Sequence, residues 1–309
     1  MNHKTNILPI LSGILTSLIF GLSFLFSKKA LSTVDPFTLL SFRFLVAFLI
    51  MTILIFCKII KINFKGKNIK NLLFLGLMQP IMYFTFETFG IQLSSSSQAG
   101  LMIALIPIFV TILSAYALKE SPSKLQCAFI LLSVSGVAFI VFMNGTSSSE
   151  GSLLGIVLLL GAVFSAAVFN ILSRKFSKEF SPLELTYAIM TMGTVFFNFI
   201  SIYNHIKSYT LAQYFSPLRN ANFLISISYL GILSSLIAFF LINFTLSKIE
   251  ASKAAIFTNL STIVSIIAGV ILLNESFKLY HLIGSILILL GVWGTNYFTN
   301  KATACSENY

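Results

Sequence analysis

The length of the apolar runs constrains this chain more than any other feature. Ten runs of about 20 residues follow one another through the 309 residues, and none of them contains more than one charged residue. At a rise of 1.5 Å per residue, an α-helix of that length crosses a hydrocarbon layer of about 30 Å. The runs cover 7–27, 36–57, 71–93, 97–118, 124–144, 151–173, 181–203, 223–246, 253–273 and 279–298. The sequence therefore predicts an all-α integral membrane protein with ten transmembrane helices.

The composition agrees with a chain that lies in lipid. Hydrophobic residues make up 57% of it and charged residues 9%, against roughly 25% charged in a soluble globular domain. A transmembrane barrel is excluded because the runs are continuous and do not alternate with a period of two. The first run is too long for the apolar region of a signal peptide and has no typical cleavage site, so we interpret it as the first span.

The basic residues predict how the chain is oriented. The net charge of +11 is divided among short loops, which argues against nucleic acid as a partner. Fourteen Lys and Arg residues fall on the side of the N-terminus and five on the other side. Positive residues resist translocation, so we expect a multi-pass protein of the cytoplasmic membrane with both termini, including the tail 299–309, in the cytoplasm. The 17 Lys against 3 Arg suggest a bacterial genome.

Two parts of the chain repeat each other. "LIPIFVTILSAYALKESPSKLQ" (105–126) aligns with "LSTIVSIIAGVILLNESFKLYH" (260–281) at a shift of 155 positions, which places Glu120 on Glu275. A weaker match places Pro36 on Pro182. Each half then contains five runs, and because five is odd the second half enters the membrane in the opposite orientation. Inverted repeats of this kind are typical of transporters that bind substrate between the halves.

The repeated residues also resemble a known family. The run ends "LKE" and "LNE", each followed 16 residues later by Gly-Val, are similar to the paired EamA domains of the drug/metabolite transporter superfamily. The resemblance covers 8–142 and 152–298 and implies ten helices that move small metabolites, amino acids or drugs through a central cavity. Phe20 stands where family members often have Trp, and Pro107 aligns with Thr262. We therefore expect no symmetric pair of kinks in the fourth and ninth runs.

One carboxylate, Glu87, lies inside the third run. Gln79, Tyr83 and Glu87 follow at i, i+4 and i+8, so on a helix they project within an arc of roughly 80°. A charged carboxylate that faces lipid costs at least about 2.5–3.5 kcal/mol, so this stripe should face the bundle interior. We expect Glu87 to handle substrate or a proton, with an interhelical tie as the alternative. Gln79 and Tyr83 are equally compatible with substrate contact and with interhelical hydrogen bonds.

Arg43 is expected at a similar depth to Glu87. It lies seven residues into the second run, about 10 Å from the outer side, and Glu87 lies about 9 Å from that side. If their faces meet, the two charges form an ion pair that opposes protonation of Glu87. The alternative is that Arg43 extends to the outer headgroups. Without the pair, Glu87 is free to exchange a proton as the cavity alternates.

The fourth and ninth runs supply further candidates for substrate contact: Gln98 near the outer end of the fourth, and Thr258 and Asn259 in the ninth. Thr262, Ser265 and Gly269 continue the face of Thr258, and small or hydroxylated faces also suit close helix packing. We interpret Glu120 and Glu275 as structural, because each can meet the positive N-terminal end of a following helix.

The inventory argues against an enzyme and predicts no cofactor or metal. Asp35 is the only aspartate, no H-E-x-x-H or Walker A motif occurs, and Cys57, Cys127 and Cys305 lack metal-ligand spacing. We therefore predict a secondary transporter or exporter of small metabolites, such as amino acids, amines or related drugs. It would work by alternating access, with proton coupling as a hypothesis, in contact with membrane lipid and as a monomer or homodimer. A channel or receptor-like protein is the alternative, ahead of a polytopic membrane enzyme.

Overall fold

Helices account for nearly all of the described chain. A computed structural model describes residues 7–118, 124–145, 153–255, 257–275 and 278–306, and within these ranges it contains helices and turns but no strand. The elements are α1 (Ile7–Leu31), α2 (Pro36–Phe56), α3 (Ile69–Gly76), η1 (Leu77–Met82), α4 (Tyr83–Gln92), α5 (Ser96–Ile103), α6 (Ile106–Leu118), α7 (Lys124–Gly145), α8 (Leu153–Phe176), α9 (Pro182–Lys207), η2 (Leu211–Gln213), η3 (Ser216–Arg219), α10 (Ala221–Ser228), η4 (Tyr229–Ile237), α11 (Ala238–Lys248), α12 (Ala251–Ala255), α13 (Thr258–Leu272) and α14 (Leu279–Ser306). The predicted all-α class is confirmed.

Seven helical segments of the described chain are long and apolar enough to cross a membrane. They are Ile7–Leu31, Pro36–Phe56, Ile69–Gln92, Ser96–Leu113, Leu153–Phe176, Pro182–Lys207 and Ala221–Lys248. Three shorter apolar helices, Cys127–Ile140, Thr258–Leu272 and Leu279–Gly294, lie within the remaining predicted runs. The total of ten spans stays a prediction.

Two helices of this bundle start at caps that the sequence repeats. Asp35 accepts hydrogen bonds from the backbone N–H groups of Phe37 and Thr38 at the start of α2, with Pro36 as its first residue. Ser181 and Glu184 form a reciprocal capping box at the start of α9, with Pro182 in the same place. A short polar side chain followed by proline is the favoured opening of a helix, so the Pro36–Pro182 match marks two equivalent helix starts.

Four of the predicted runs contain irregular helices, and these irregularities occur in pairs at equivalent runs of the two halves. Leu77–Met82 and Tyr229–Ile237 are π-helical stretches in the third and eighth runs, and Gln79 inside the first has an extended backbone (φ −147°, ψ 115°). In the fourth run α5 ends at Ile103 and α6 begins at Ile106, while in the ninth α12 ends at Ala255 and α13 begins at Thr258. Inserted residues and broken helices of this kind are frequent at functional sites.

The expectation of no symmetric interruption in the fourth and ninth runs was therefore wrong. Pro107 lies at the start of α6, but the ninth run breaks without a proline. The hydroxyl of Thr258 donates to the carbonyl of Ala255 at 2.6 Å. A hydroxyl that satisfies a local carbonyl offers the backbone an alternative to the helical hydrogen bond, so this bond is compatible with a break at that point of the ninth run.

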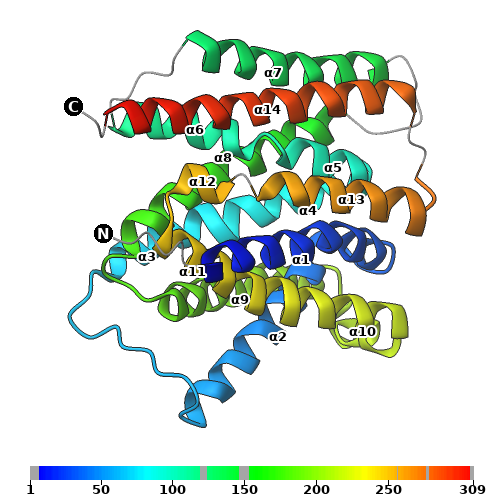
Figure 1. Cartoon of the computed structure of the whole chain (residues 1–309). Coiled ribbons are helices and arrows are strands. Elements are labelled where there is room, and N and C mark those ends of the chain that lie inside the picture. The colour runs from blue at the N-terminus through cyan, green and yellow to red at the C-terminus, as the bar shows by residue number, and fades with distance from the viewer. Residues whose placement is uncertain (1–6, 119–123, 146–152, 256, 276–277, 307–309) are drawn as a thin grey trace.

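Helices α7 and α14 lie side by side along one edge of the bundle (Figure 1). Gly136 of α7 faces Gly284 of α14, and the Ser133 hydroxyl donates to the Ile288 carbonyl across the pair at 3.1 Å. Small residues let two helix backbones approach closely where lipid offers no hydrophobic driving force. The glycines of the last run therefore serve packing.

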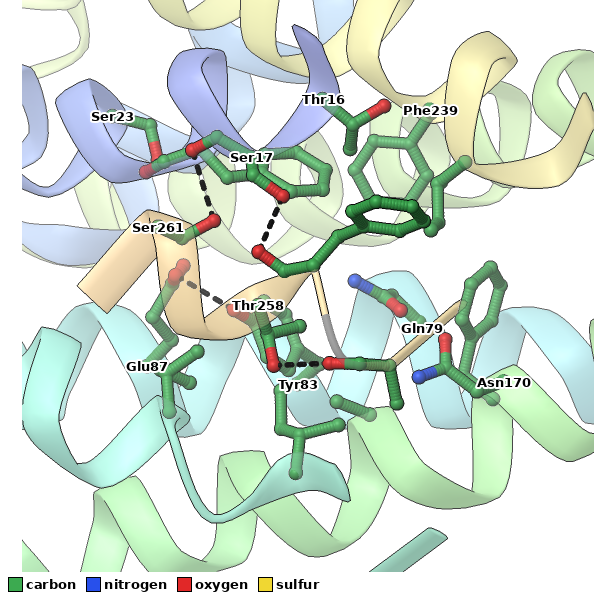
Figure 2. Close-up of a pocket in the computed structure, with 18 of the residues that line it drawn as sticks. Thr16, Ser17, Ser23, Gln79, Tyr83, Glu87, Asn170, Phe239, Thr258 and Ser261 are labelled. Carbon is green, nitrogen blue, oxygen red and sulfur yellow. Dashed lines mark hydrogen bonds between the residues drawn. The ribbon is translucent and has the colours of Figure 1, made fainter. Parts of the chain in front are cut away.

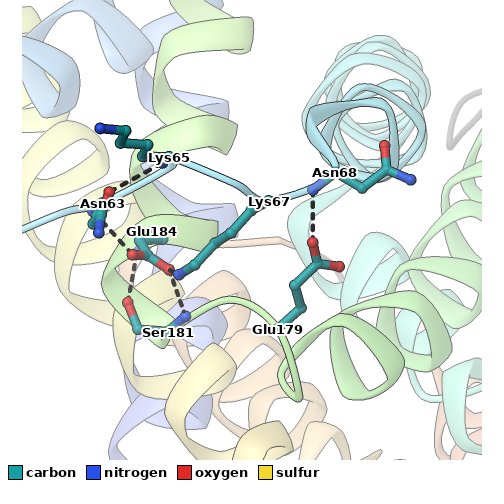
Figure 3. A network of polar contacts seen from close by, with 7 residues as sticks. All are labelled: Asn63, Lys65, Lys67, Asn68, Glu179, Ser181 and Glu184. Atoms are coloured by element: carbon teal, nitrogen blue, oxygen red, sulfur yellow. Dashed lines mark hydrogen bonds and ion pairs between the residues drawn. The ribbon is translucent and has the colours of Figure 1, made fainter.

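At one end of the bundle, the loop between α2 and α3 is tied to the loop before α9 (Figure 3). Glu184 accepts hydrogen bonds from Lys67 Nζ at 2.5 Å, the Asn63 backbone N–H at 3.0 Å and the Ser181 backbone N–H at 2.8 Å. Glu179 accepts a further bond from the Asn68 backbone N–H at 2.6 Å. Every oxygen of Glu184 has a donor, so this network is a structural clamp between the α2–α3 loop and the start of α9 with the loop before it.

Candidate functional site

An internal cavity lies between α1, α8 and the irregular stretches of the third, fourth and ninth runs (Figure 2). The centre of a water-sized sphere can occupy about 70 Å³ of it, and one water needs roughly 10–15 Å³ by that measure. Polar side chains from both halves of the chain line it: Thr16, Ser17, Ser23, Arg43, Gln79, Tyr83, Glu87, Asn170, Thr258 and Ser261. The cavity therefore has room for several waters or for part of a small molecule among polar partners.

Aromatic side chains form much of the rest of the cavity wall. Phe20, Phe24, Phe84, Phe169, Phe239 and Phe257 line it, and the ring of Phe239 lies 5.7 Å from Phe20, 5.8 Å from Phe84 and 6.2 Å from Phe169, measured between centroids. Edge-to-face and tilted rings at these distances hold one another in place. The phenylalanine part of the wall is thus preformed, and it includes Phe20.

Glu87 lies in this cavity, in α4. Its side chain is 3% exposed, and the Tyr83 hydroxyl donates to its Oε1 at 2.9 Å. The other oxygen, Oε2, is buried and has no hydrogen-bond partner in the described structure. An unsatisfied buried carboxylate oxygen costs free energy, and such groups in native proteins call for an explanation such as a missing ligand or proton.

Two amide side chains in the cavity also lack hydrogen-bond partners in the described structure. Gln79 is 7% exposed and Asn170 is 8% exposed, and both line the cavity. Neither side chain is hydrogen-bonded to another described residue. Gln79 reaches the cavity from the extended backbone of η1, and Asn170 reaches it from α8 (Figure 2). Each amide offers a donor and an acceptor to a bound molecule.

Arg43 lines the same cavity but does not pair with Glu87. Its Nε donates to the Ser235 hydroxyl at 2.9 Å, and its Nη2 donates to the Ser234 hydroxyl at 2.8 Å, both from η4. The guanidinium lies over the ring of Phe84, 4.3 Å from its centroid. Within the described chain no nitrogen of Arg43 comes within 4.0 Å of an oxygen of Glu87.

Both earlier hypotheses about Arg43 are corrected by this geometry. The described structure shows no direct ion pair between Arg43 and Glu87, and the guanidinium instead donates to the two serines of η4. Extension to the outer headgroups is also wrong, since the side chain is 2% exposed. Arg43 is instead a fixed positive charge in the cavity wall, stabilised by two hydroxyls and an aromatic face.

The other predicted site residues separate into one at the cavity and two away from it. Thr258 lines the cavity at the start of α13, whereas Gln98 and Asn259 do not. Gln98 is buried in the capping box of α5, where its backbone N–H donates to the Ser95 hydroxyl at 3.0 Å. A helix cap explains its position. Asn259 keeps a buried Oδ1 without a hydrogen-bond partner in the described structure, and we have no physical account of it.

The remaining candidates on the ninth run serve packing and capping. The Thr262 hydroxyl donates to the Gly100 carbonyl at 2.8 Å, and a Cβ on Gly100 would collide with Ser265. This is the close packing that the sequence offered as an alternative. Glu275 accepts hydrogen bonds at the N-terminus of α5, which is not the following helix in the chain. Glu120 lies outside the described residues.

Sequence reasoning missed the polar side chains that α1 and α8 bring to the cavity. Ser12, Thr16, Ser23 and Ser27 recur at helical spacing in the first run, and Asn170 is the only amide in the run 151–173. Both signals were readable. Arg43's partners Ser234 and Ser235 left no comparable signal, since they are 191 and 192 positions away. The described residues contain no group of His, Cys, Asp and Glu that could hold a metal ion.

Comparison with known proteins identifies similar chains. The sequence model of one family, described as the EamA-like transporter family, matches residues 7–142 and 153–297. The chain is 44% identical to an uncharacterized transporter, YcxC, of Bacillus subtilis (strain 168) over 95% of its own length and 94% of that protein. It is 29% identical to an uncharacterized transporter of Archaeoglobus fulgidus over 90% of its length and 95% of that protein.

One solved structure shares the fold. It is titled only as the crystal structure of a protein, and it aligns with a TM-score of 0.61 at 17% identity, covering 94% of this chain and 96% of that chain. The likeness extends over nearly all of both chains, and at this identity it concerns the fold alone.

Proposed function

The chain belongs to the EamA-like transporter family, as its sequence resemblance indicated, and from that premise we propose that it is a secondary transporter that exports or exchanges small metabolites by alternating access. The observation that carries the proposal is the cavity with open polar groups. Glu87 Oε2 and the amides of Gln79 and Asn170 lack protein partners in the described structure. Buried polar groups are normally paired, so the buried Glu87 Oε2 without a partner, beside two amides that form no hydrogen bond to the described protein, supports a binding site for a polar molecule.

The architecture we propose is ten spans in two inverted repeats of five. The two separate family matches and the paired irregularities support it, because π-helical stretches occur in the third and eighth runs and interruptions in the fourth and ninth. Three of the four irregular runs line the cavity within or next to their irregular stretch. The lining residues are Gln79 and Tyr83 in the third run, Ile103 and Ile106 in the fourth, and Ala255 and Thr258 in the ninth. Broken helices that expose backbone groups at a shared cavity are typical of inverted-repeat transporters.

The substrate class that fits the cavity is a small molecule with an amine and an apolar body, such as an amino acid, an amine or a related drug. Glu87 Oε2 offers an acceptor for an ammonium group, and Arg43 adds a positive charge that favours a carboxylate. The phenylalanine wall suits an apolar side chain or an aromatic ring, and rings also attract cations. The transported molecule would be the only required partner besides lipid, with no cofactor.

Proton coupling is the mechanism that we propose for Glu87. A carboxyl group that alternates between a dry cavity and water changes its affinity for a proton, because desolvation disfavours the charged form. Tyr83 holds Oε1 by a hydrogen bond, which leaves Oε2 to take up and release the proton or to meet a substrate ammonium. The transporter would then couple the flux of its substrate to the proton gradient.

The proposed location is the cytoplasmic membrane with both termini in the cytoplasm, as the loop charges predict. Labelling of single-cysteine variants with a membrane-impermeant maleimide tests it. Lys65 and Gln92 are both exposed and lie at opposite ends of the third run. We expect Gln92→Cys to react from outside intact cells and Lys65→Cys to react only in inverted vesicles. The reverse pattern overturns the orientation.

The experiment that tests transport starts with ligand discovery on purified protein. A thermal-shift screen against amino acids, nucleosides and cationic drugs selects a ligand, because any molecule that binds the folded state alone raises the melting temperature. The selected ligand is then radiolabelled, and its uptake into proteoliposomes that are preloaded with unlabelled ligand is measured. A carrier gives exchange that saturates with concentration. Flux that rises linearly and shows no exchange would instead favour a channel.

A further inference from the structure

A seam between the two halves of the chain begins at the cavity and runs to one end of the bundle. Helix α5 lies in the first stretch matched by the family and α13 in the second. Ile103 of α5 and Ser261 of α13 line the cavity. Beyond them the Thr262 hydroxyl donates to the Gly100 carbonyl at 2.8 Å, and Gly269 lies so close to Ser97 that a Cβ would collide with it. Along this seam the two backbones leave no free space.

Glu275 closes the far end of the seam. Its Oε1 accepts a hydrogen bond from the Ser96 backbone N–H at 2.7 Å, and its Oε2 accepts from the Ser97 backbone N–H at 2.9 Å and from the Ser97 hydroxyl at 2.6 Å. These donors are the first residues of α5, where free N–H groups and the helix dipole favour an anion. One carboxylate therefore binds the second half to the first through three charge-assisted hydrogen bonds.

The "LNE" sequence explains how Glu275 reaches α5. Asn274 has a φ of 52°, in the left-handed region that asparagine tolerates better than most residues. This turn ends α13 and brings the Glu275 backbone N–H back to the Gly269 carbonyl at 3.1 Å. Leu273 ends the helix, Asn274 reverses the chain and Glu275 binds the neighbouring helix, so each residue of the triplet has a defined place.

Lys28 reinforces the same end of the seam from α1. Its Nζ donates to the Ile91 carbonyl at 2.8 Å and also contacts the Ser94 carbonyl, both at the carbonyl end of α4. The turn between α4 and α5 is thus held by a cation on its carbonyl side and by a carboxylate on its N–H side. Opposite charges at the two sides also attract each other.

We propose that Glu275 is the latch of a gate: its carboxylate holds the α5–α13 seam shut, and its release from Ser96 and Ser97 opens the cavity toward the α4–α5 turn. This inference rests on the proposed function, because a carrier that works by alternating access must close its cavity on one side, and we assign that closure to the α5–α13 seam. A cap within one half could stay in place throughout the cycle. This cap joins the halves, so any separation of α5 from α13 must break it.

The test measures access to the cavity and needs no substrate. In a chain whose Cys57, Cys127 and Cys305 are replaced by Ser, Ser23→Cys places a thiol in the cavity wall. A sulfonated, membrane-impermeant maleimide labels it from outside intact cells and, separately, in inverted vesicles, with Gln92→Cys and Lys65→Cys as reporters of each side. Glu275→Gln is compared with Glu184→Gln, a matched change in a buried carboxylate that also accepts three hydrogen bonds.

We expect Glu275→Gln to raise the rate of labelling from the side of Gln92, relative to the other side, by about tenfold, because the amide loses the charge and one acceptor. Glu184→Gln should not raise it. If Glu275→Gln lowers the melting temperature but leaves the ratio of the two rates unchanged, Glu275 is a static cap and the latch is overturned. If the starting Ser23→Cys chain reacts from neither side, alternating access itself fails, which separates failure of the proposed function from failure of the latch.

Discussion

Glu87 and Glu184 are buried to nearly the same degree, yet their surroundings differ in kind. Glu87 is 3% exposed and Glu184 is 4% exposed. In the clamp between the loops, Glu184 accepts hydrogen bonds from Lys67, Asn63 and Ser181. In the cavity, Glu87 accepts one hydrogen bond from Tyr83 and keeps Oε2 open. Both carboxylate oxygens have hydrogen-bond donors in Glu184 at the end of the bundle, whereas only one has a donor in Glu87 in its centre.

The difference separates a structural carboxylate from a functional one. A fully paired buried charge fixes two segments together, and removing a partner is costly because the other group is left unpaired. A carboxylate with one free oxygen beside a cavity contributes less to the fold and has a position left for a ligand or a proton. Glu275 resembles Glu184 because it also accepts three hydrogen bonds, here from Ser96 and Ser97. It differs in where it lies, since it joins the two halves of the chain.

The largest effect is expected from Glu87→Gln. The amide mimics a carboxyl group that cannot release its proton, so ligand accumulation driven by a proton gradient should vanish while exchange of labelled for unlabelled ligand continues. Proteoliposome uptake with and without an imposed gradient measures both quantities in one preparation. Accumulation at the wild-type level in Glu87→Gln would remove the carboxylate from the coupling mechanism.

Glu184→Gln should have the opposite profile. Loss of the charge weakens three hydrogen bonds in the clamp, and bonds to charged groups contribute about 1.5–3 kcal/mol each when one partner is removed. We expect a lower melting temperature, equivalent to about 2 kcal/mol, with exchange kinetics unchanged for the protein that remains folded. Thermal unfolding in detergent and exchange at a permissive temperature report the two effects. A variant with wild-type stability would show that the clamp is not structural.

Asn170→Ala extends the comparison to an uncharged group in the cavity. Since Asn170 has no partner in the described protein, its removal should leave the melting temperature of the free protein unchanged. It should weaken ligand binding by about tenfold, the loss of one hydrogen bond of roughly 1.4 kcal/mol. Titration of the selected ligand by calorimetry gives the dissociation constant. Destabilisation with unchanged affinity would assign Asn170 to the fold.

Gln98→Ala provides a control at a predicted site residue that the structure places in a helix cap. Loss of the reciprocal cap should lower stability by about 1 kcal/mol. Ligand affinity should remain at the wild-type value, because Gln98 does not line the cavity. A loss of affinity at unchanged stability would return Gln98 to the binding site.

The smallest effect is expected from the coupling between Arg43 and Glu87. Because no direct ion pair joins them in the described structure, a cycle of Arg43→Gln, Glu87→Gln and the double variant should give a coupling energy under about 1 kcal/mol. Unfolding of all four proteins measures it. Recovery of stability in the double variant would show that the two charges pair in the membrane after all.

The sequence predicted much of the fold because hydropathy and helix-start signals are local. The apolar runs marked every helical segment of the described chain longer than 18 residues. The interruption between Ala255 and Thr258 escaped prediction because no proline marks it in the sequence. The capping box of Gln98 was readable from Ser95 three residues before it, yet Gln98 also suggests a substrate contact because it is a polar residue near the outer end of the fourth run.

The candidate site was predictable to the extent that it lies on one helix face. Gln79, Tyr83 and Glu87 line the cavity together, as their spacing of four residues indicated, although the backbone at Gln79 is not helical. The position of Arg43 was not predictable, since Ser234 and Ser235 come from the other half of the chain. The partner of Glu275 is equally distant in sequence, 178 to 179 positions away. Contacts between the two halves cannot be predicted from the pattern of residues within one run.

The most direct test of the open carboxylate is proton movement that accompanies ligand flux. A weakly buffered suspension of proteoliposomes with a pH-sensitive dye in the lumen receives a pulse of the selected ligand without any imposed gradient. We expect a change in lumenal pH with wild-type protein and with Glu184→Gln, and no change with Glu87→Gln although labelled ligand still exchanges. A pH change of wild-type size in Glu87→Gln would contradict the claim that the unpaired oxygen of Glu87 carries the proton.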